Sequence, residues 1–207
     1  MPVVTISRQF GAGGSSVAAL VAAGMGAEVV DRKLIDQVAA KLALEPSEVE
    51  EEEERPRTLF ESLVRSFSTL EPGMGAGWTP PYPDPLFDPR KEIIALTEQM
   101  IREAAATGNV VIVGRGASFL LKDLPGVFRV FLWAPESVRI KTVMKRFSLA
   151  EAEATKRTHE TDANRAAYNR QLYGHNWSDP ESFDLTVSTG RVGYEATAQM
   201  ILGALKG

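Results

Sequence analysis

A glycine-rich segment near the N-terminus carries the residues with the clearest chemical potential. The β-branched run Val3 to Ile6 leads into Gly-Ala-Gly-Gly at residues 11–14, and a helix-forming run extends from Val17 to Ala23. In a strand, glycine loop and helix of this kind, backbone N–H groups and the helix N-terminus can bind a phosphate. A tight turn that binds no ligand is the alternative. The predicted phosphate-binding residues are Gly11, Ala12, Gly13, Gly14, Ser15 and Ser16.

A phosphate-binding loop of this kind usually works with a bound Mg²⁺ and a positively charged side chain. The hydroxyls of Ser15 and Ser16 fall in the first helical turn, where the Ser15 hydroxyl could approach a phosphate-bound Mg²⁺. The Walker pattern G-x-x-x-x-G-K-[ST] has a lysine before the hydroxyl residue, and this chain has Gly14 at that place. Arg8 is the only basic residue close to the loop in the sequence. We therefore predict that Arg8 supplies the missing positive charge.

Two further candidates follow predicted strands. Arg115 lies between two glycines directly after the apolar run 110–113, and Asp31-Arg32 follows the short run Val29-Val30. Ligands of open parallel sheets bind beyond the carboxyl ends of the strands, where an arginine can offer a phosphate a planar fork of donors. The alternative is an arginine paired with a carboxylate. Asp31 could order Mg²⁺ and water, accept a substrate hydroxyl, or cap a helix that begins near Arg32.

Residues 139–170 form the basic part of an otherwise acidic chain. Phosphoryl transfer needs cations around the developing charge, and arginines commonly supply them. Arg157 and Arg165 bracket the segment 158–164, which could interrupt the helix and serve as the hinge of a lid. Surface helices with ordinary salt bridges are the alternative.

Alternating strands and helices must position these residues. The strands are predicted at 3–6, 29–30, 110–113, 127–133 and 185–187. The helices are predicted at 17–23, 32–43, 89–106, 136–147, 149–172 and 194–205. The run 110–113 is apolar throughout, and 127–133 is interrupted only by Arg129. Nearly continuous apolar strands that alternate with helices indicate a parallel sheet covered on both faces. Capping boxes are expected at Ser47 with Glu50 and at Ser148 with Glu151, and Asp88 should cap a helix starting at Pro89.

The segment 45–88 differs from the rest of the chain and is predicted to be an insertion between the second and third strands. It contains five consecutive acids at 50–54, an amphipathic piece at 59–67 and a Gly/Pro-rich stretch at 71–85. The acid run is best interpreted as a solvated helix face, with a metal site or a site for a basic partner as the alternative.

Composition narrows the class of protein. The 207 residues carry a net charge of −4, which argues against bulk nucleic-acid binding. The absence of cysteine excludes disulfides and thiolate metal sites. No apolar run approaches the ~20 residues that span a bilayer, and a strand begins too early for a signal peptide. We expect a single cytoplasmic domain over residues 1–207.

Several segments together resemble the cytidylate kinase-like proteins, a branch of the P-loop nucleoside monophosphate kinases. Residues 7–14, Ser-Arg-Gln-Phe-Gly-Ala-Gly-Gly, resemble the opening loop of that family. The other matching segments are 30–35, 111–116, Ala134-Pro135 with Arg139, Asp162 with Arg165, 173–177 and 183–189. In ordinary cytidylate kinases a lysine stands at the position of Gly14 and an acidic residue at the position of Val113.

The resemblance implies an α/β protein with the three-layer P-loop NTPase fold. It implies a parallel sheet of about five strands flanked by helices, an acceptor-binding insertion at about 45–88 and a helical lid at about 148–172. ATP would be the donor, Mg²⁺ the cofactor and a nucleoside monophosphate such as CMP or dCMP the acceptor. The catalytic residues would be Arg8, Arg157 and Arg165, the acceptor residues Asp31, Arg32 and Arg115, and the metal-binding residues Ser15 and Asp31.

Two other functions stay open at this point. The missing Walker lysine favours a nucleotide-binding regulatory protein without turnover, and the divergent acceptor region is compatible with a kinase of a non-nucleotide alcohol. The expected partners are small-molecule nucleotides, with neither nucleic acid nor a membrane, and the sequence leaves open whether the chain forms a homo-oligomer.

Overall fold

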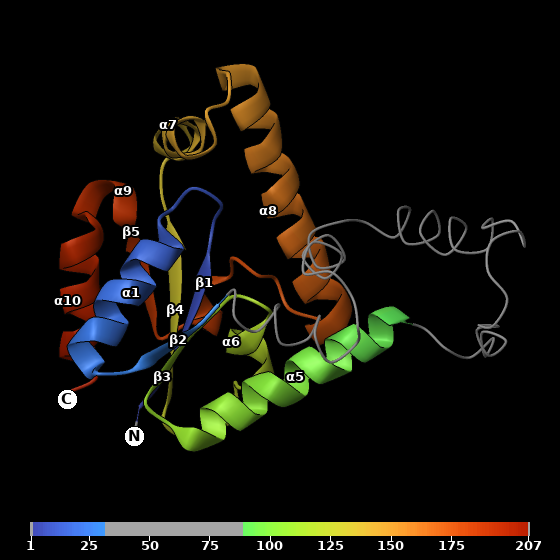
Figure 1. The fold of residues 1–207 in the computed structure, drawn as a ribbon, viewed down its shortest axis with the longest axis vertical. Helices are drawn as coiled ribbons and strands as arrows, with labels where there is room; N and C mark the ends of the chain where they lie inside the picture. The colour runs from blue at the N-terminus through green and yellow to red at the C-terminus, as the bar shows by residue number, and fades with distance from the viewer. Residues whose placement is uncertain (1, 32–88, 207) are drawn as a thin grey trace, which may run out of the picture.

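One parallel sheet organises the molecule. The computed structural model describes residues 2–31 and 89–206. Its strands are β1 (Val3–Arg8), β2 (Glu28–Val30), β3 (Val110–Val113), β4 (Val127–Trp133) and β5 (Leu185–Ser188). They lie in the order β2-β3-β1-β4-β5 (Figure 1). Val3 of the central strand β1 pairs with Val110 on one side and Val127 on the other. Because all pairs are parallel, the carboxyl ends of the five strands share one edge.

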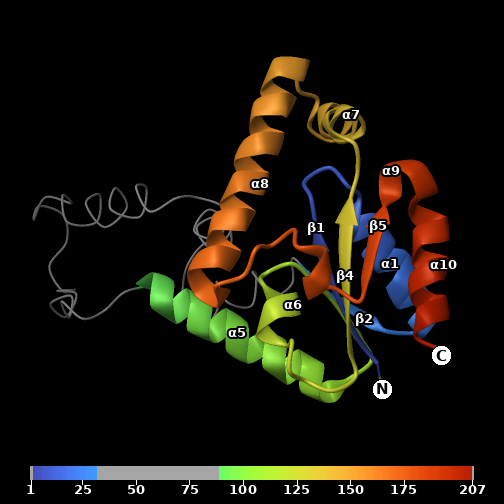
Figure 2. The same cartoon turned by 180° about the vertical axis from the view of Figure 1, so that it is seen from behind.

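Helices cover both faces of the sheet. On one face lie α1 (Gly14–Met25) and α10 (Tyr194–Ala204), and on the other lie α5 (Pro89–Thr107) and the short α6 (Ala117–Leu120) (Figures 1 and 2). Val4 and Ile6 are fully buried in the first layer, whereas Val3 and Ile112 pack with Ile101 of α5. The result is the predicted three-layer α/β architecture.

A pair of helices rises beyond the carboxyl edge of the sheet. It consists of α7 (Glu136–Phe147) and α8 (Glu151–Tyr173), which pack on each other around Val143 and Ala154. From this end α8 descends along the molecule towards α6 and α5, as Figures 1 and 2 both show. The remaining elements are the 3₁₀ turn at Pro180–Ser182 and α9 (Thr189–Val192). Among the described residues, no helix has the length and apolar character needed to cross a bilayer.

Two local predictions were wrong. Ser148 does not cap α8: it ends α7 with φ 55°, donating its N–H to the carbonyl of Met144, and Ala150 precedes α8 without a side-chain cap. An N-capping serine needs an extended backbone, which this helix-ending geometry denies it. The proposed break at 158–164 is also absent, because α8 is continuous from Glu151 to Tyr173. The segment contains neither glycine nor proline, the residues that most strongly interrupt helices.

All five predicted strands are confirmed, as are the predicted helices from Val17, Pro89, Glu136, Leu149 and Tyr194, apart from their ends. The predicted helix at 32–43, the Ser47–Glu50 capping box, the Asp88 cap, Arg32 and the 45–88 insertion lie outside the described residues.

Candidate active site

The glycine loop joins β1 to α1 at the carboxyl edge of the sheet. Gly11 and Gly13 have φ values of 80° and 79°, in the left-handed region that favours glycine. A Cβ at Gly11 would lie 2.7 Å from the carbonyl oxygen of Arg139, and one at Gly13 would enter the ring of Tyr194. Among residues 2–31 and 89–206, no side chain caps the N-terminus of α1. The first amides of α1 therefore face the loop in the arrangement that binds anions at helix N-termini.

Arg8 fills the space where the Walker lysine would begin. A Cβ at Gly14 would lie 2.6 Å from Cγ of Arg8, and a Cβ at Gly114 would collide with the Arg8 guanidinium. The Arg8 side chain thus extends from the end of β1, across the start of α1, to the turn after β3. Its stem explains why residue 14 is glycine: a side chain at this position would displace Arg8.

Three predicted arginines meet in one pocket. Arg8 comes from β1, Arg115 from the turn after β3 and Arg165 from α8. The pocket encloses about 60 Å³. Its described lining residues are Ser7, Arg8, Gly114, Arg115, Gly116, Arg165, Tyr168, Asn169 and Trp177. None of these is acidic, so the pocket concentrates positive charge and can offer guanidinium forks to an anionic ligand.

The turn that carries Arg115 has an unusual backbone. Gly114, Arg115 and Gly116 all have positive φ, at 76°, 57° and 68°. Gly114 leaves room for the Arg8 guanidinium, and Gly116 leaves room for the ring of Tyr173. The left-handed conformation is uncommon for arginine and is often found at functional sites. Both glycines are therefore needed for two reasons: they permit the positive φ of the turn, and they leave space for the side chains that pack at the pocket wall.

A chain of hydroxyl groups leads from the pocket into the core. The Ser7 and Ser118 hydroxyl oxygens lie 3.1 Å apart, and Ser118 donates to Thr5 Oγ1 over 2.9 Å. Since Ser118 uses its proton on Thr5, Ser7 must donate to Ser118. The Ser7 oxygen therefore presents only lone pairs to the pocket, where it can accept a hydrogen bond from a ligand. Ser7 was not among the residues predicted from the sequence.

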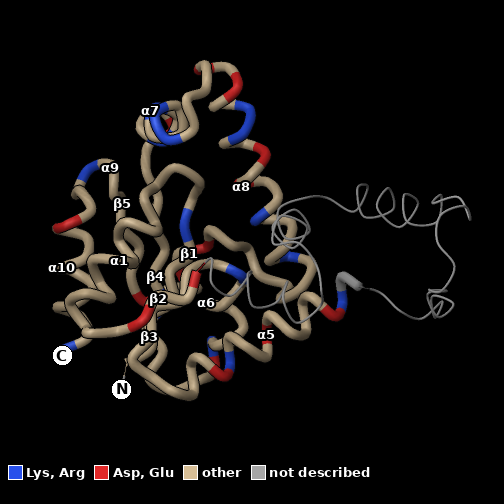
Figure 3. Tube along the Cα trace, viewed as in Figure 1, with Lys and Arg blue, Asp and Glu red and all other residues tan. Residues whose placement is uncertain are grey.

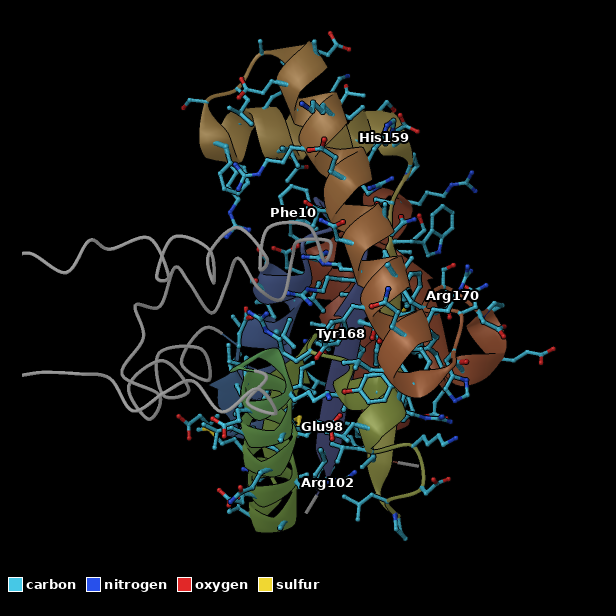
Figure 4. The ribbon with its side chains drawn as sticks, turned by 90° about the vertical axis from the view of Figure 1, so that its right-hand side faces the viewer. Phe10, Glu98, Arg102, His159, Tyr168 and Arg170 are labelled. Carbon is cyan, nitrogen blue, oxygen red and sulfur yellow. The ribbon has the colours of Figure 1, made fainter. Side chains whose placement is uncertain are left out.

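Tyr168 and Asn169 also escaped prediction, although they follow Arg165 by about one helical turn and that spacing could have revealed them. Below the pocket the Tyr173 hydroxyl donates to Glu98 Oε1 over 3.1 Å. Burial raises the pKa of Tyr173, and the nearby Tyr168 and Glu98 raise it further, so this tyrosine stays protonated. The contact ties α8 to α5; Figure 4 shows Tyr168 and Glu98 on these two helices.

The candidate metal residues lie beside the loop. Ser15 Oγ donates to Asp31 Oδ2 over 3.1 Å, although the two residues are far apart in the sequence. Asp31 does not line the pocket of Arg8, Arg115 and Arg165. Of the roles considered for Asp31, its position favours the metal over the acceptor. Oxygen atoms of this kind suit Mg²⁺, which commonly binds through one or two carboxylates together with substrate phosphates.

Arg157 lies outside the pocket that Arg165 lines, although the Arg165 guanidinium carbon is also near the Phe10 ring, 5.5 Å from its centre. The Arg157 guanidinium carbon is 4.0 Å from the ring centre of Phe147 and 5.9 Å from that of Phe10. Arg157 is exposed and does not line the pocket, whereas Arg165 does. Basic positions recur along α7 and α8 (Figure 3), but the structure brings only Arg165 of the two predicted α8 cations to the other arginines.

Comparison with known proteins agrees with this geometry. The model of the cytidylate kinase-like family matches residues 3–191. The chain belongs to this family. It is 30% identical over 112 residues to a cytidylate kinase from Methanopyrus kandleri, an alignment covering 50% of this chain and 58% of that protein. The chain thus spans only about half the length of the curated relatives it matches.

Two solved structures share the fold of this family member over its whole length. An uncharacterized protein from Eubacterium ventriosum has a TM-score of 0.72 at 20% identity, covering 100% of this chain and 99% of that one. A shikimate kinase from Bacteroides thetaiotaomicron has a TM-score of 0.55 at 14% identity, with coverage of 100% and 99%. At these identities the likeness concerns the fold, which is the three-layer P-loop α/β fold.

Proposed function

We propose that the protein transfers a phosphoryl group from ATP to a nucleoside monophosphate, with CMP or dCMP as the preferred acceptor. The observation that carries this proposal is the meeting of Arg8, Arg115 and Arg165 in one pocket beside the glycine loop. Membership of the cytidylate kinase-like family supports the nucleotide class of both substrates. The M. kandleri relative, described as a cytidylate kinase, supports CMP.

In this proposal the loop holds the donor phosphates. The amides of residues 11–16 surround them, and Arg8 provides the cation that a lysine provides in the Walker pattern. Ser15 Oγ and Asp31 Oδ2 lie 3.1 Å apart, and they fit Mg²⁺ because both are hard oxygen atoms next to the loop. The metal would neutralise charge on the donor phosphates.

The pocket arginines would act on the acceptor side. Arg115 would bind the acceptor phosphate through its planar fork, and Arg165 would face the transferred group. Phosphoryl transfer requires little covalent work from a protein, because positioning and stabilisation of charge lower most of the barrier. A fixed set of guanidinium groups in a small pocket supplies both. The catalytic role of Arg157 stays a prediction, since its guanidinium lies against Phe147.

One specific observation favours a second function. Gly14 replaces the Walker lysine, so the chain could bind nucleotide as a regulatory protein without turnover. The proposal of catalysis requires that Arg8 compensates for the lysine, and its position over Gly14 supports this.

A coupled ADP-release assay separates these functions. The purified protein is mixed with ATP, Mg²⁺ and a panel of nucleoside monophosphates and small alcohols, with calorimetry of ATP binding in parallel. We expect ADP release with CMP or dCMP above that with other acceptors. ATP binding without turnover would identify the regulatory protein, and release with an alcohol alone would identify the third function that the sequence left open.

Arg115→Lys tests the acceptor side. We expect this variant to raise the acceptor KM about tenfold or more and to leave ATP affinity nearly unchanged, because a lysine cannot reproduce a bidentate contact with phosphate. Steady-state kinetics measure the first quantity and calorimetry the second. Arg102→Lys, at an exposed position on α5 (Figure 4), is the matched control. Weakened ATP binding with an unchanged acceptor KM would assign Arg115 to the donor site instead.

A further inference from the structure

Side chains from the helix pair α7 and α8 form hydrogen bonds with the backbone at the start of the glycine loop. Asp162 Oδ1 accepts the N–H of Phe10 over 2.8 Å, and Arg139 Nη1 donates to the carbonyl of Phe10 over 3.1 Å. Arg139 Nη1 also donates to Asp162 Oδ2 over 2.7 Å, forming an ion pair. We propose that Arg139 and Asp162 are positioning residues that set the donor-binding shape of the glycine loop by fixing both polar groups of Phe10.

Burial and additional hydrogen bonds restrain the Arg139–Asp162 ion pair to a single geometry. The side chains of Arg139 and Asp162 are only 7% and 19% exposed. Arg139 Nε donates to the carbonyl of Ala134 over 3.1 Å, which anchors the guanidinium to the end of β4. Loss of either partner would leave the other with unmet polar groups in a largely buried place. The pair therefore resists any displacement of the Phe10 peptide.

The contacts that fix Phe10 also constrain the glycines that follow it. The residue after Phe10 is Gly11, whose missing Cβ makes room for the backbone of Arg139 itself. The ring of Phe10 stacks on Phe147 of α7 with centroids 6.0 Å apart. Both the main chain and the side chain of Phe10 are thus held from α7 and α8. A shift of this residue would move Gly11 and the amides beyond it.

The helix α8 carries both Asp162, which fixes Phe10, and Arg165, which lines the arginine pocket. Asp162 and Arg165 are three residues apart on α8 and so share one helical face. Arg165 Nη1 donates to the carbonyl of Arg8 over 3.1 Å. Arg8 stands two residues before Phe10, whose N–H is bound by Asp162. The α8 helix therefore fixes residues 8–10 at two points while presenting Arg165 to the pocket. This arrangement makes α8 a fixed wall at this point, in contrast to the hinge expected from the sequence.

The chain contains a matched control pair. Arg129 and Asp184 form an ion pair of 3.0 Å, and Asp184 Oδ2 accepts the backbone N–H of Arg129 over 2.7 Å. This pair joins β4 to the residue before β5, near the amino ends of the strands and away from the loop. It has the same residue types and a comparable set of contacts. Asp184→Asn should cost stability without touching the glycine loop.

The experiment compares Asp162→Asn with Asp184→Asn in the full chain. Because the inference rests on the proposed kinase function, two readouts are used: kcat/KM for ATP, and hydrogen exchange of the amides of residues 10–14. We expect Asp162→Asn to lower kcat/KM for ATP on the order of tenfold to a hundredfold, since small displacements of positioning groups have such effects. Loop exchange should accelerate, while the acceptor KM changes little. Asp184→Asn should change none of these quantities.

Each outcome decides the inference. Equal kcat/KM for the two variants at matched melting temperatures, or unchanged exchange of residues 10–14 in Asp162→Asn, would overturn it. If the wild type releases no ADP, the proposed function fails, and exchange together with binding of inorganic tripolyphosphate still tests the positioning role. If Asp162→Asn does not fold, Arg139→Lys serves as the second variant. It keeps the charge but loses the fork that reaches Phe10, Asp162 and Ala134, and the same results are expected.

Discussion

We expect Arg8→Ala to lower turnover on the order of a hundredfold to a thousandfold, the range observed when one preorganised transition-state donor is removed. The physical reason is the course of its side chain: the stem crosses the start of α1, and the guanidinium reaches the turn after β3, at the pocket shared with Arg115 and Arg165. ATP binding should weaken much less than kcat falls. Single-turnover ADP release with saturating acceptor, together with calorimetry of ATP binding, measures the two quantities.

Arg170→Ala is the control for Arg8→Ala, because Arg170 is exposed on α8 (Figure 4) and does not line the pocket. A second variant sharpens the test. Gly14→Lys alone collides with the stem of Arg8, whereas the double variant Arg8→Ala/Gly14→Lys removes the Cγ and Cδ atoms of Arg8 that the new Cβ would meet. We expect the double variant to recover part of the lost turnover. Near wild-type turnover in Arg8→Ala would move the cationic role to Arg157 or Arg165.

We expect Gly13→Val to weaken ATP binding strongly in a protein that still folds. Any side chain at residue 13 must adopt a φ near 79° and enters the ring of Tyr194, so the loop cannot keep its shape. Losing two charge-assisted hydrogen bonds to phosphate, at roughly 1.5–2 kcal/mol each, corresponds to a loss of affinity on the order of a hundredfold to a thousandfold. Calorimetry gives the affinity, and circular dichroism confirms the fold.

Gly26→Val separates backbone strain from the loop effect. Gly26 ends α1 with φ 61°, and a Cβ there would meet nothing within 4 Å. This control should lose stability through the left-handed backbone, about 1–2 kcal/mol, and keep its ATP affinity. A folded Gly13→Val variant with unchanged ATP affinity would show that the glycine loop does not bind the donor phosphates.

Local pattern in the sequence determined most of the framework. The mainly apolar runs 3–6, 110–113 and 127–133 became the central strands because runs with apolar residues on both faces suit a sheet covered on both sides. The glycine loop and Arg115 were found because they follow strands, and parallel strands bring their carboxyl ends to one edge. Arg8 was found because it is the only basic residue close to the loop in the sequence. The family resemblance was confirmed over residues 3–191.

Only the tertiary structure decided how these parts meet. In the sequence Gly114 and Gly116 look like residues needed only for a turn, yet each makes room for a side chain from a distant segment, and Gly14 makes room for the stem of Arg8, six positions earlier. The choice of Arg165 over Arg157 for the pocket, and the hold of Asp162 on Phe10, depend on where α8 packs. The continuous α8 likewise replaced the expected hinge. Periodicity and capping patterns describe neighbours along the chain. Apart from Gly14 with Arg8, these contacts join residues about 50 to 150 positions apart, so packing alone sets them.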